Sequence, residues 1–378
     1  MASEFRPSSH LGYVDTLRGL AALYVVIHHA VPYIHRSTEG VVHLFLSGFT
    51  YGHYAVDIFI TLSGFCLALP TVRSGGVLRG GAWGFIKRRA RRILPPYYAS
   101  MVFCLILIAT LLGPGTGTNW DIAAKPTPSG IAAAALLLQD VFVWSVGGQI
   151  NYPFWSVAIE WHIYFIFPII LWFGNRLGRT LILTLFILLP IAGAFLLRFT
   201  GWAWFYFQFL GLFTMGIAAA HATFSANPRI ERLRRQIPWL LPTLACAACA
   251  VALCVLLPEA RWTRSWAIAD GFSGAATACA LVYLGSHPHR QILRLSEWWP
   301  FVGLGKFSYS LYLMHAPVLQ LVWLGLGKIY PSATSNVAFV FLAVPICVGF
   351  SWIFYRAFEE PFLRAPLPAI PAAAQGVS

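Results

Sequence analysis

Long runs of apolar residues, separated by short polar stretches, dominate the pattern of the chain. Ten of these runs are about 20 residues long, the length of α-helix needed to cross the hydrocarbon core of a bilayer. They cover residues 14–34, 51–71, 95–113, 154–174, 180–198, 202–222, 238–258, 267–285, 307–327 and 336–358. The pattern therefore predicts an all-α polytopic membrane protein with about ten transmembrane helices in a single domain.

An eleventh apolar run, residues 131–146, is shorter and contains Asp140. It could be a further span, or a re-entrant or interfacial piece. With ten spans and a cytoplasmic N-terminus, 20 of the 26 Lys and Arg residues lie in cytoplasmic segments, as the positive-inside rule requires. An eleventh span would move the arginines of residues 232–235 to the outer side. We therefore expect ten spans, both termini in the cytoplasm and a long outer loop at residues 114–153.

Composition supports a membrane protein. Charged residues make up 10% of the chain and the mean hydropathy is +0.69, whereas about a quarter of a soluble protein is charged. We expect one transmembrane domain at residues 1–365, with a first apolar run that is retained and not cleaved as a signal peptide. A disordered Pro/Ala-rich tail is expected at residues 366–378. The net charge of +13 follows from topology, so membrane lipid is expected as a partner and nucleic acid is not.

The cysteines and a histidine-rich loop give little sign of metal or redox chemistry. Cysteine inside an apolar run behaves as a small hydrophobic residue, so we expect no disulfides and interpret the CxxC at residues 246–249 as packing. The HPH stretch at residues 287–289 lacks further ligands, and we expect no metal. All seven cysteines fall within apolar runs: Cys66, Cys104, Cys246, Cys249, Cys254, Cys279 and Cys347.

The first apolar run carries ionisable residues, which a simple membrane anchor would not. Arg18 and His29 are eleven positions apart, so on a helix they project from one face about 16 Å apart, while His28 points elsewhere. Ionisable residues inside a span usually line a cavity or meet a partner. The alternative is that Arg18 reaches the inner headgroups and His29 hydrogen-bonds a neighbouring helix.

Two other runs carry carboxylates at a depth that we expect to match His29. Counted inward from the outer surface, Asp57 and Glu160 lie about two turns into their spans. Together with His29 they are predicted to form one layer in the outer half of the membrane, with Arg18 near the inner surface. A carboxylate beside a histidine fixes its tautomer and raises its basicity, as a general base acting on a hydroxyl requires. We predict His29, Arg18, Asp57 and Glu160 as catalytic residues.

A basic segment between the second and third spans is the candidate binding site for phosphate. Arg89 and Arg92 are three residues apart, hence neighbours on a short helix that Pro95 and Pro96 are expected to end. Arg88 and Arg91 form a second such pair. Planar guanidinium groups suit bidentate recognition of phosphate, although a cluster that only sets topology and contacts anionic lipid would look the same.

Three further positions are predicted to contact substrate. They are Ser63, Tyr164 and His315, all within apolar runs. For His315, in the middle of its span, a hydrogen bond between helices is an equally good interpretation.

Six stretches of the chain form a series. They read DTLRGLAALYVVIHHA, YAVDIFITLSGF, RRARRILPPYY, NYPFWSVAIEWHIYF, GKFSYSLYLMHAPV and EEPF, in this order. Each is weak alone, but together they resemble the membrane-bound acyltransferase 3 family over nearly the whole chain. Thr61 and the segment AIEWH depart from the usual family pattern. These departures affect the expected acceptor more than the expected type of reaction.

The resemblance implies a function. It implies ten spans without an appended hydrolase-like domain, and O-acylation of a carbohydrate or lipid-linked hydroxyl at the outer side of a bacterial inner membrane. The donor would be cytoplasmic acyl-CoA, with acetyl-CoA the expected case and no metal. Family roles fall on Arg18 and His29 as the essential pair. They fall on Arg89 and Arg92 as the RxxR element, and we add Arg88 and Arg18 to the predicted cofactor-binding set.

Two alternatives use the same residues. A proton-coupled transporter also places ionisable groups in its spans, but it often has inverted repeats, which this sequence lacks. An acyltransferase of this length could also act on a small secondary metabolite. The sequence leaves the acyl group, the acceptor, the oligomeric state and any acyl-histidine intermediate undetermined.

Overall fold

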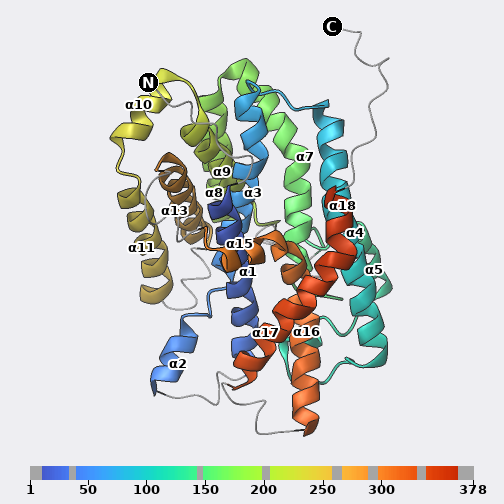
Figure 1. Ribbon diagram of the computed structural model, residues 1–378. Coiled ribbons are helices and arrows are strands. Elements are labelled where there is room, and N and C mark those ends of the chain that lie inside the picture. Colours follow the sequence, from blue (N-terminus) through green and yellow to red (C-terminus); the bar gives the residue numbers. More distant parts are fainter. Residues whose placement is uncertain are drawn as a thin grey trace.

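The structure is a computed structural model that describes residues 11–33, 40–142, 148–197, 205–257, 266–287, 297–329 and 338–364. Within these ranges every regular element is helical, and the long helices stand side by side as a bundle (Figure 1). The predicted tail at residues 366–378 lies outside the described residues.

Each of the ten predicted spans contains one long helix. Seven helices of the described part are long and apolar enough to cross a membrane, or eight if α9 and α10, which meet at 97°, form one bent span. The all-helical, multi-span prediction is confirmed, while the exact number of crossings stays a prediction. The ten helices are α1 (Gly12–Ala30), α3 (His53–Arg73), α4 (Gly81–Thr110), α7 (Phe154–Leu177), α8 (Arg179–Leu197), α9 (Gln208–Phe224), α11 (Leu240–Leu256), α13 (Trp266–Ser286), α16 (Ser308–Ile329) and α17 (Ala338–Phe354).

Shorter elements join the long helices. α17 continues through a π-helical turn, Tyr355–Glu359, into α18 (Glu360–Arg364). The others are α2 (Gly40–Ser47), α5 (Pro128–Ala135), α10 (Pro228–Gln236) and α15 (Trp299–Lys306).

The predicted break at Pro95 and Pro96 is wrong. α4 runs without interruption through both prolines, so the basic segment forms the first turns of a 30-residue helix. Proline removes two backbone hydrogen bonds there, but in a packed membrane helix neighbouring groups take over the freed partners. The arginines therefore project from the rigid extension of a long helix and not from a separate short one.

The ambiguous run at residues 131–146 does not form a spanning helix where it is described. Its helix, α5, covers eight residues and is followed by turns up to residue 142. Eight residues span only about 12 Å. Asp140 is buried and its Oδ2 lies 2.9 Å from His162 Nδ1 on α7, which ties this segment to the bundle.

Glycines let α3 and α9 pack closely. A Cβ on Gly64 would overlap the carbonyl oxygen of Phe213, and one on Gly216 would overlap that of Thr61. Small residues at such crossings allow backbones to approach in membrane proteins, where lipid gives helices no hydrophobic reason to associate.

Close packing at glycines also positions α1. Gly305 of α15 lies against the Asp15 carbonyl, and a Cβ on Gly19 would meet the Phe301 carbonyl oxygen at 2.7 Å. These contacts flank Arg18 in the sequence, so close packing against α15 fixes the rotation of α1 and the direction in which Arg18 points.

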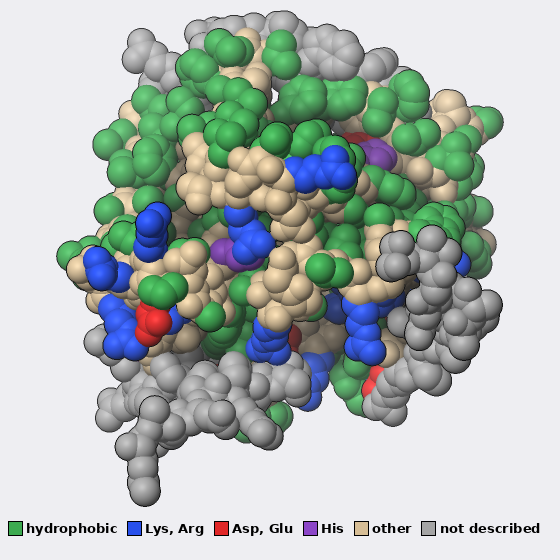
Figure 2. Space-filling model, turned by 90° about the horizontal axis from the view of Figure 1, so that it is seen from above, with side chains coloured by type: hydrophobic (Ala, Val, Ile, Leu, Met, Phe, Trp, Pro, Cys, Tyr) green, Lys and Arg blue, Asp and Glu red, His purple; other side chains and the backbone are tan. Residues whose placement is uncertain are grey.

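Basic residues gather at one end of the bundle. Figure 2 looks onto the end that carries α10, the top of Figure 1, and Lys and Arg side chains stand out across it. The α3–α4 connection lies at this end too. The positive-inside rule makes it the cytoplasmic end in the topology that we expect.

Candidate active site

A large basic cavity opens beside the α3–α4 connection. It has a volume of about 1950 Å³, with walls from α1, α3, α4, α7 and α16. Its lining includes one carboxylate, that of Glu160. Seven cationic residues line it: Arg18, Arg73, Arg79, Lys87, Arg88, Arg89 and Arg92. Such an excess of positive charge favours a ligand that carries several negative charges.

The structure brings the predicted RxxR pair into this cavity. Arg89 and Arg92 both line it, and the Nε–H of Arg89 is buried without a hydrogen-bond partner. Arg88 also lines the cavity, but its guanidinium donates a 2.8 Å hydrogen bond to the Arg79 carbonyl, which holds the α3–α4 turn. A buried donor without a partner costs free energy unless a ligand accepts from it, so Arg89 is the arginine best prepared for a phosphate.

Glu160 organises the middle of the cavity. Tyr164, one turn further along α7, donates a 2.5 Å hydrogen bond to Glu160 Oε1, and its hydroxyl lies 3.3 Å from Ser63 Oγ. Arg18 and Arg89 both interact electrostatically with this carboxylate. Three predicted residues, Ser63, Glu160 and Tyr164, thus form one connected group among the arginines.

Tyr312 lines the cavity and also contacts His315. Its hydroxyl lies 2.6 Å from Ser156 Oγ, and both residues line the cavity. His315 lies one helical turn after Tyr312. Its Nδ1 is 2.7 Å from the backbone carbonyl oxygen of Tyr312, and the centroids of the two rings are 5.8 Å apart. One aromatic ring therefore separates the basic cavity from His315.

His29 and His315 form a stacked pair. Their ring centroids lie 5.1 Å apart with planes inclined by 23°, and Tyr152 lies 4.7 Å from His29. His29 Nδ1 and His315 Nε2 are both buried without a hydrogen-bond partner. Buried polar atoms normally have partners, so two free imidazole nitrogens at one place indicate a site that receives a ligand.

His28 belongs to a different contact, as the helical spacing predicts. Its Nδ1 lies 2.8 Å from the Phe49 carbonyl oxygen, and its ring lies so close to Gly52 that a Cβ there would overlap it. His28 thus fastens the turn between α2 and α3, although its ring still touches that of His29.

The predicted layer of His29, Asp57 and Glu160 is wrong. Tyr152, just before α7, lies at the level of His29, so Glu160 stands about 12 Å deeper and shares the cavity with Arg18. Asp57 is about 120° round α3 from Ser63, and it lies beside Asp270 of α13 and His53 of its own helix, not beside His29. Counting depth from a common surface failed because α7 begins inside the bundle.

Several site residues were not singled out from the sequence. Tyr152 and Ser156 lie in the NYPFWSVAIEWHIYF stretch, and Tyr312 lies one turn before His315. Glu359 accepts hydrogen bonds from the Ser310 amide (3.2 Å) and hydroxyl (2.5 Å) and interacts electrostatically with the cavity arginines. A carboxylate buried at the end of an apolar run is the signal that would have found Glu359.

The structure thus combines a bundle of long apolar helices with a basic cavity that lies near a histidine pair. The family model described as an acyltransferase domain matches residues 11–356, and the chain belongs to this acyltransferase 3 family. The resemblance noted from the six sequence stretches is thereby confirmed.

Curated relatives agree with the family. A Staphylococcus aureus (strain COL) protein named "Putative O-acetyltransferase" is 22% identical over 408 residues, covering 97% of this chain and 60% of the relative. A Bacillus subtilis (strain 168) protein named "Putative peptidoglycan O-acetyltransferase YrhL" is 25% identical over 345 residues, covering 84% of this chain and 50% of the relative. The chain thus spans about half to three fifths of their length. No solved structure matches the chain.

Proposed function

We propose that the protein transfers an acyl group, acetyl in the expected case, from cytoplasmic acyl-CoA to a hydroxyl of a carbohydrate or lipid-linked saccharide at the outer side of the bacterial inner membrane. The observation that carries the proposal is the basic cavity, which opens beside the α3–α4 connection and ends one ring away from the His29–His315 pair.

The donor fits this cavity by charge and by shape. Coenzyme A carries several phosphates at one end and a neutral pantetheine arm ending in the thioester. Arg89 and Arg92 would bind phosphate, with Arg88 near the mouth and Arg18 further in. The arm would lie along α1, whose axial rise from Arg18 to His29 is about 16 Å, so that the thioester reaches Tyr312 and the histidines.

His29 is the general base of the proposed reaction. It takes the proton from the acceptor hydroxyl as the oxygen attacks the thioester carbonyl carbon, and the carbon–sulfur bond then breaks. The CoA thiolate leaves and takes that proton from His29, which restores the neutral imidazole, so no oxidant or further reactant is needed. His315 replaces Asp57 as the residue that positions His29, because it is the group stacked on that ring. Glu160 and Tyr164 orient the arginines and the donor.

The nature of the acceptor rests on the relatives. The name of the Bacillus subtilis relative YrhL specifies peptidoglycan, a glycan, which supports a carbohydrate acceptor here. The topology expected from the charge distribution completes the proposal, with one domain at residues 1–365, ten crossings and both termini in the cytoplasm.

The test is acyl transfer by the purified protein in lipid nanodiscs. Acetyl-CoA with a radiolabelled acetyl group is added together with peptidoglycan fragments or lipid-linked saccharide, and labelled ester is measured after hydroxylamine treatment of a matched sample. We expect label in the saccharide that hydroxylamine removes. A protein that neither binds acetyl-CoA nor transfers label, but moves protons or solute in liposomes, would instead support the transporter.

A further inference from the structure

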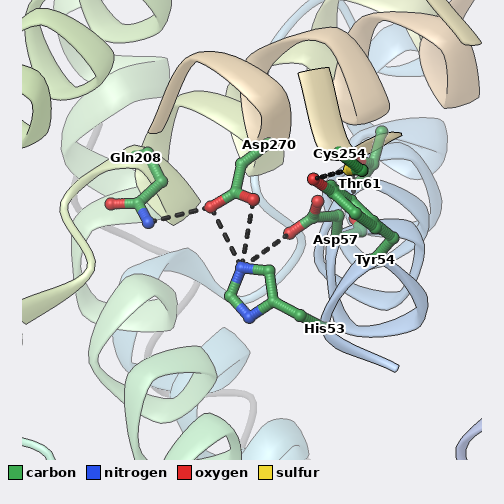
Figure 3. A network of polar contacts seen from close by, with 7 residues as sticks. All are labelled: His53, Tyr54, Asp57, Thr61, Gln208, Cys254 and Asp270. Carbon is green, nitrogen blue, oxygen red and sulfur yellow. Dashed lines mark hydrogen bonds and ion pairs between the residues drawn. The ribbon is translucent and has the colours of Figure 1, made fainter. Parts of the chain in front are cut away.

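A second polar cluster, which shares no residue with the lining of the basic cavity, lies between α3, α9 and α13. His53 Nε2 lies 3.0 and 3.1 Å from the two carboxylate oxygens of Asp270, and 3.9 Å from Asp57 Oδ1 (Figure 3). Gln208 donates a 2.9 Å hydrogen bond to Asp270 Oδ2. α3 runs from this cluster toward the basic end of the bundle, so the cluster lies in the opposite half.

The two carboxylates are buried deeply, and one lacks a donor. Asp57 and Asp270 are both 0% exposed. Both carboxylate oxygens of Asp57 are buried and neither has a hydrogen-bond partner. A buried charge without a partner is costly, and a bound ion is one of the few arrangements that remove the cost.

Histidine protonation alone does not solve this problem. The Nε2 of His53 carries at most one hydrogen, which the shorter distances direct to Asp270. Asp57, at 3.9 Å, stays outside hydrogen-bonding range. A divalent cation between the three side chains would contact all of them, and its charge of +2 would balance the two carboxylates.

The donor atoms are close to the arrangement that zinc requires. One ligand atom from each of the three residues lies within 4.8 Å of the other two. In a tetrahedral site with bonds of about 2.0–2.2 Å, neighbouring ligand atoms are about 3.3–3.6 Å apart. The observed separations from His53 Nε2, 3.0 and 3.9 Å, lie on either side of that value. An imidazole with two carboxylates suits Zn²⁺ better than Ca²⁺ or Mg²⁺, which prefer oxygen ligands.

Aromatic rings pack around His53. Trp266 and Trp155 stack on its ring at 5.3 and 6.3 Å between centroids, and Phe209 lies at 5.7 Å. The His53 side chain is still 14% exposed. The cluster is therefore largely enclosed, and His53 is its partly exposed member.

We propose that His53, Asp57 and Asp270 bind a divalent transition-metal ion of the zinc class, leaving a fourth coordination position open. This site lies outside the acyl-transfer machinery proposed above and departs from the expectation of no metal drawn from the sequence. It would tie α3 to α13 through one ion.

The experiment measures metal bound to the full chain purified in detergent. The protein is stripped with a chelator, incubated with Zn²⁺ and passed through gel filtration, and metal is then counted by mass spectrometry. We expect one Zn²⁺ per chain in the wild type and loss of that ion in His53→Gln, Asp57→Asn and Asp270→Asn. His162→Gln is the matched control, because His162 and Asp140 form a 2.9 Å pair elsewhere on the bundle, and it should retain the ion.

Cobalt keeps the test independent of the variants. Wild-type protein titrated with Co²⁺ should develop the intense visible bands of a four-coordinate site, and Zn²⁺ should abolish them. If gel filtration and thermal unfolding show that a variant does not fold, the cobalt titration of the wild type still tests the proposal. Wild type that holds no more Zn²⁺ than the variants and shows no cobalt bands would overturn the proposal. Displacement of Co²⁺ by Mg²⁺ or Ca²⁺ at equal concentration would overturn the assignment to the zinc class.

Discussion

The ring of His315 stacks on the ring of His29, with centroids 5.1 Å apart and planes inclined by 23°. The pair comes from α1 and α16, which are far apart in the sequence. Each ring has a buried nitrogen without a partner. The pair is thus both a contact that holds two helices together and a set of free basic nitrogens.

Replacing His29 should abolish acyl transfer. General bases contribute about 100- to 10,000-fold to rate, so His29→Ala should lose at least that much in kcat while binding acetyl-CoA normally. His28→Ala is the control on the neighbouring position, since His28 contacts the Phe49 carbonyl, and it should keep substantial activity. The measurement is transfer to glycan by membranes with matched expression. Near-normal transfer by His29→Ala would reject the mechanism, and equal loss in both variants would indicate a structural fault in α1.

His315 is expected to act through His29. His315→Ala should lower kcat by about 10- to 100-fold with little change in the KM for acetyl-CoA, because it positions the base and does not bind the phosphates. His315→Phe keeps an aromatic stack but has no ring nitrogen. If stacking alone matters, His315→Phe restores activity; if the free Nε2 matters, it does not, and we expect the second result. A rise in KM at unchanged kcat would contradict the positioning role.

Arg89 should matter more for donor binding than its neighbour Arg91. A charge-assisted hydrogen bond contributes about 1.5–3 kcal/mol, so Arg89→Ala should weaken CoA affinity by about 10- to 100-fold. Arg89→Lys should recover little of it, because lysine lacks the planar fork. Arg91→Ala is the control, since Arg91 is not among the residues that line the cavity. Calorimetry measures the CoA affinity of all three variants. Unchanged affinity in an Arg89→Ala, Arg92→Ala double variant would show that the cluster only sets topology.

The charge distribution predicts the sidedness of two segments. A single cysteine introduced at the exposed residue 119 of a cysteine-free chain should react with a membrane-impermeant thiol reagent from the outer side. One introduced at residue 233, in α10, should react only after the membrane is opened. Labelling of both positions from the same side would contradict the ten-span topology.

Close packing of α3 on α9 should make Gly64 sensitive to a single methyl group. Gly64→Ala places a Cβ on the Phe213 carbonyl oxygen, and overpacking of this kind costs about 1–3 kcal/mol of unfolding free energy. Gly193→Ala in α8 is the control, because nothing lies within 4 Å of the added atom. Thermal unfolding in detergent should separate the two variants, and an equal Tm would show that the α3–α9 crossing can adjust.

Much of this protein could be predicted from local pattern. The apolar runs determined the helical, membrane-spanning class, because a backbone in lipid must satisfy its own hydrogen bonds, and all ten predicted ranges contain a long helix. Helical periodicity also determined that Arg89 and Arg92 share a face and that His28 and His29 do not, since these relations depend only on 100° per residue.

Depth and partnership were decided only by the tertiary structure. Glu160 belongs with Arg18 and not with His29, because α7 starts inside the bundle and a count from the surface cannot detect that offset. His53 and Asp57 are neighbours on one face of α3 by helical spacing, but they meet Asp270 only because glycine contacts set how α3 sits against α9 and its neighbour α13. Periodicity specifies which residues share a face of one helix, whereas the rotation and axial shift between two helices follow from side-chain packing along their whole contact, which no single segment encodes.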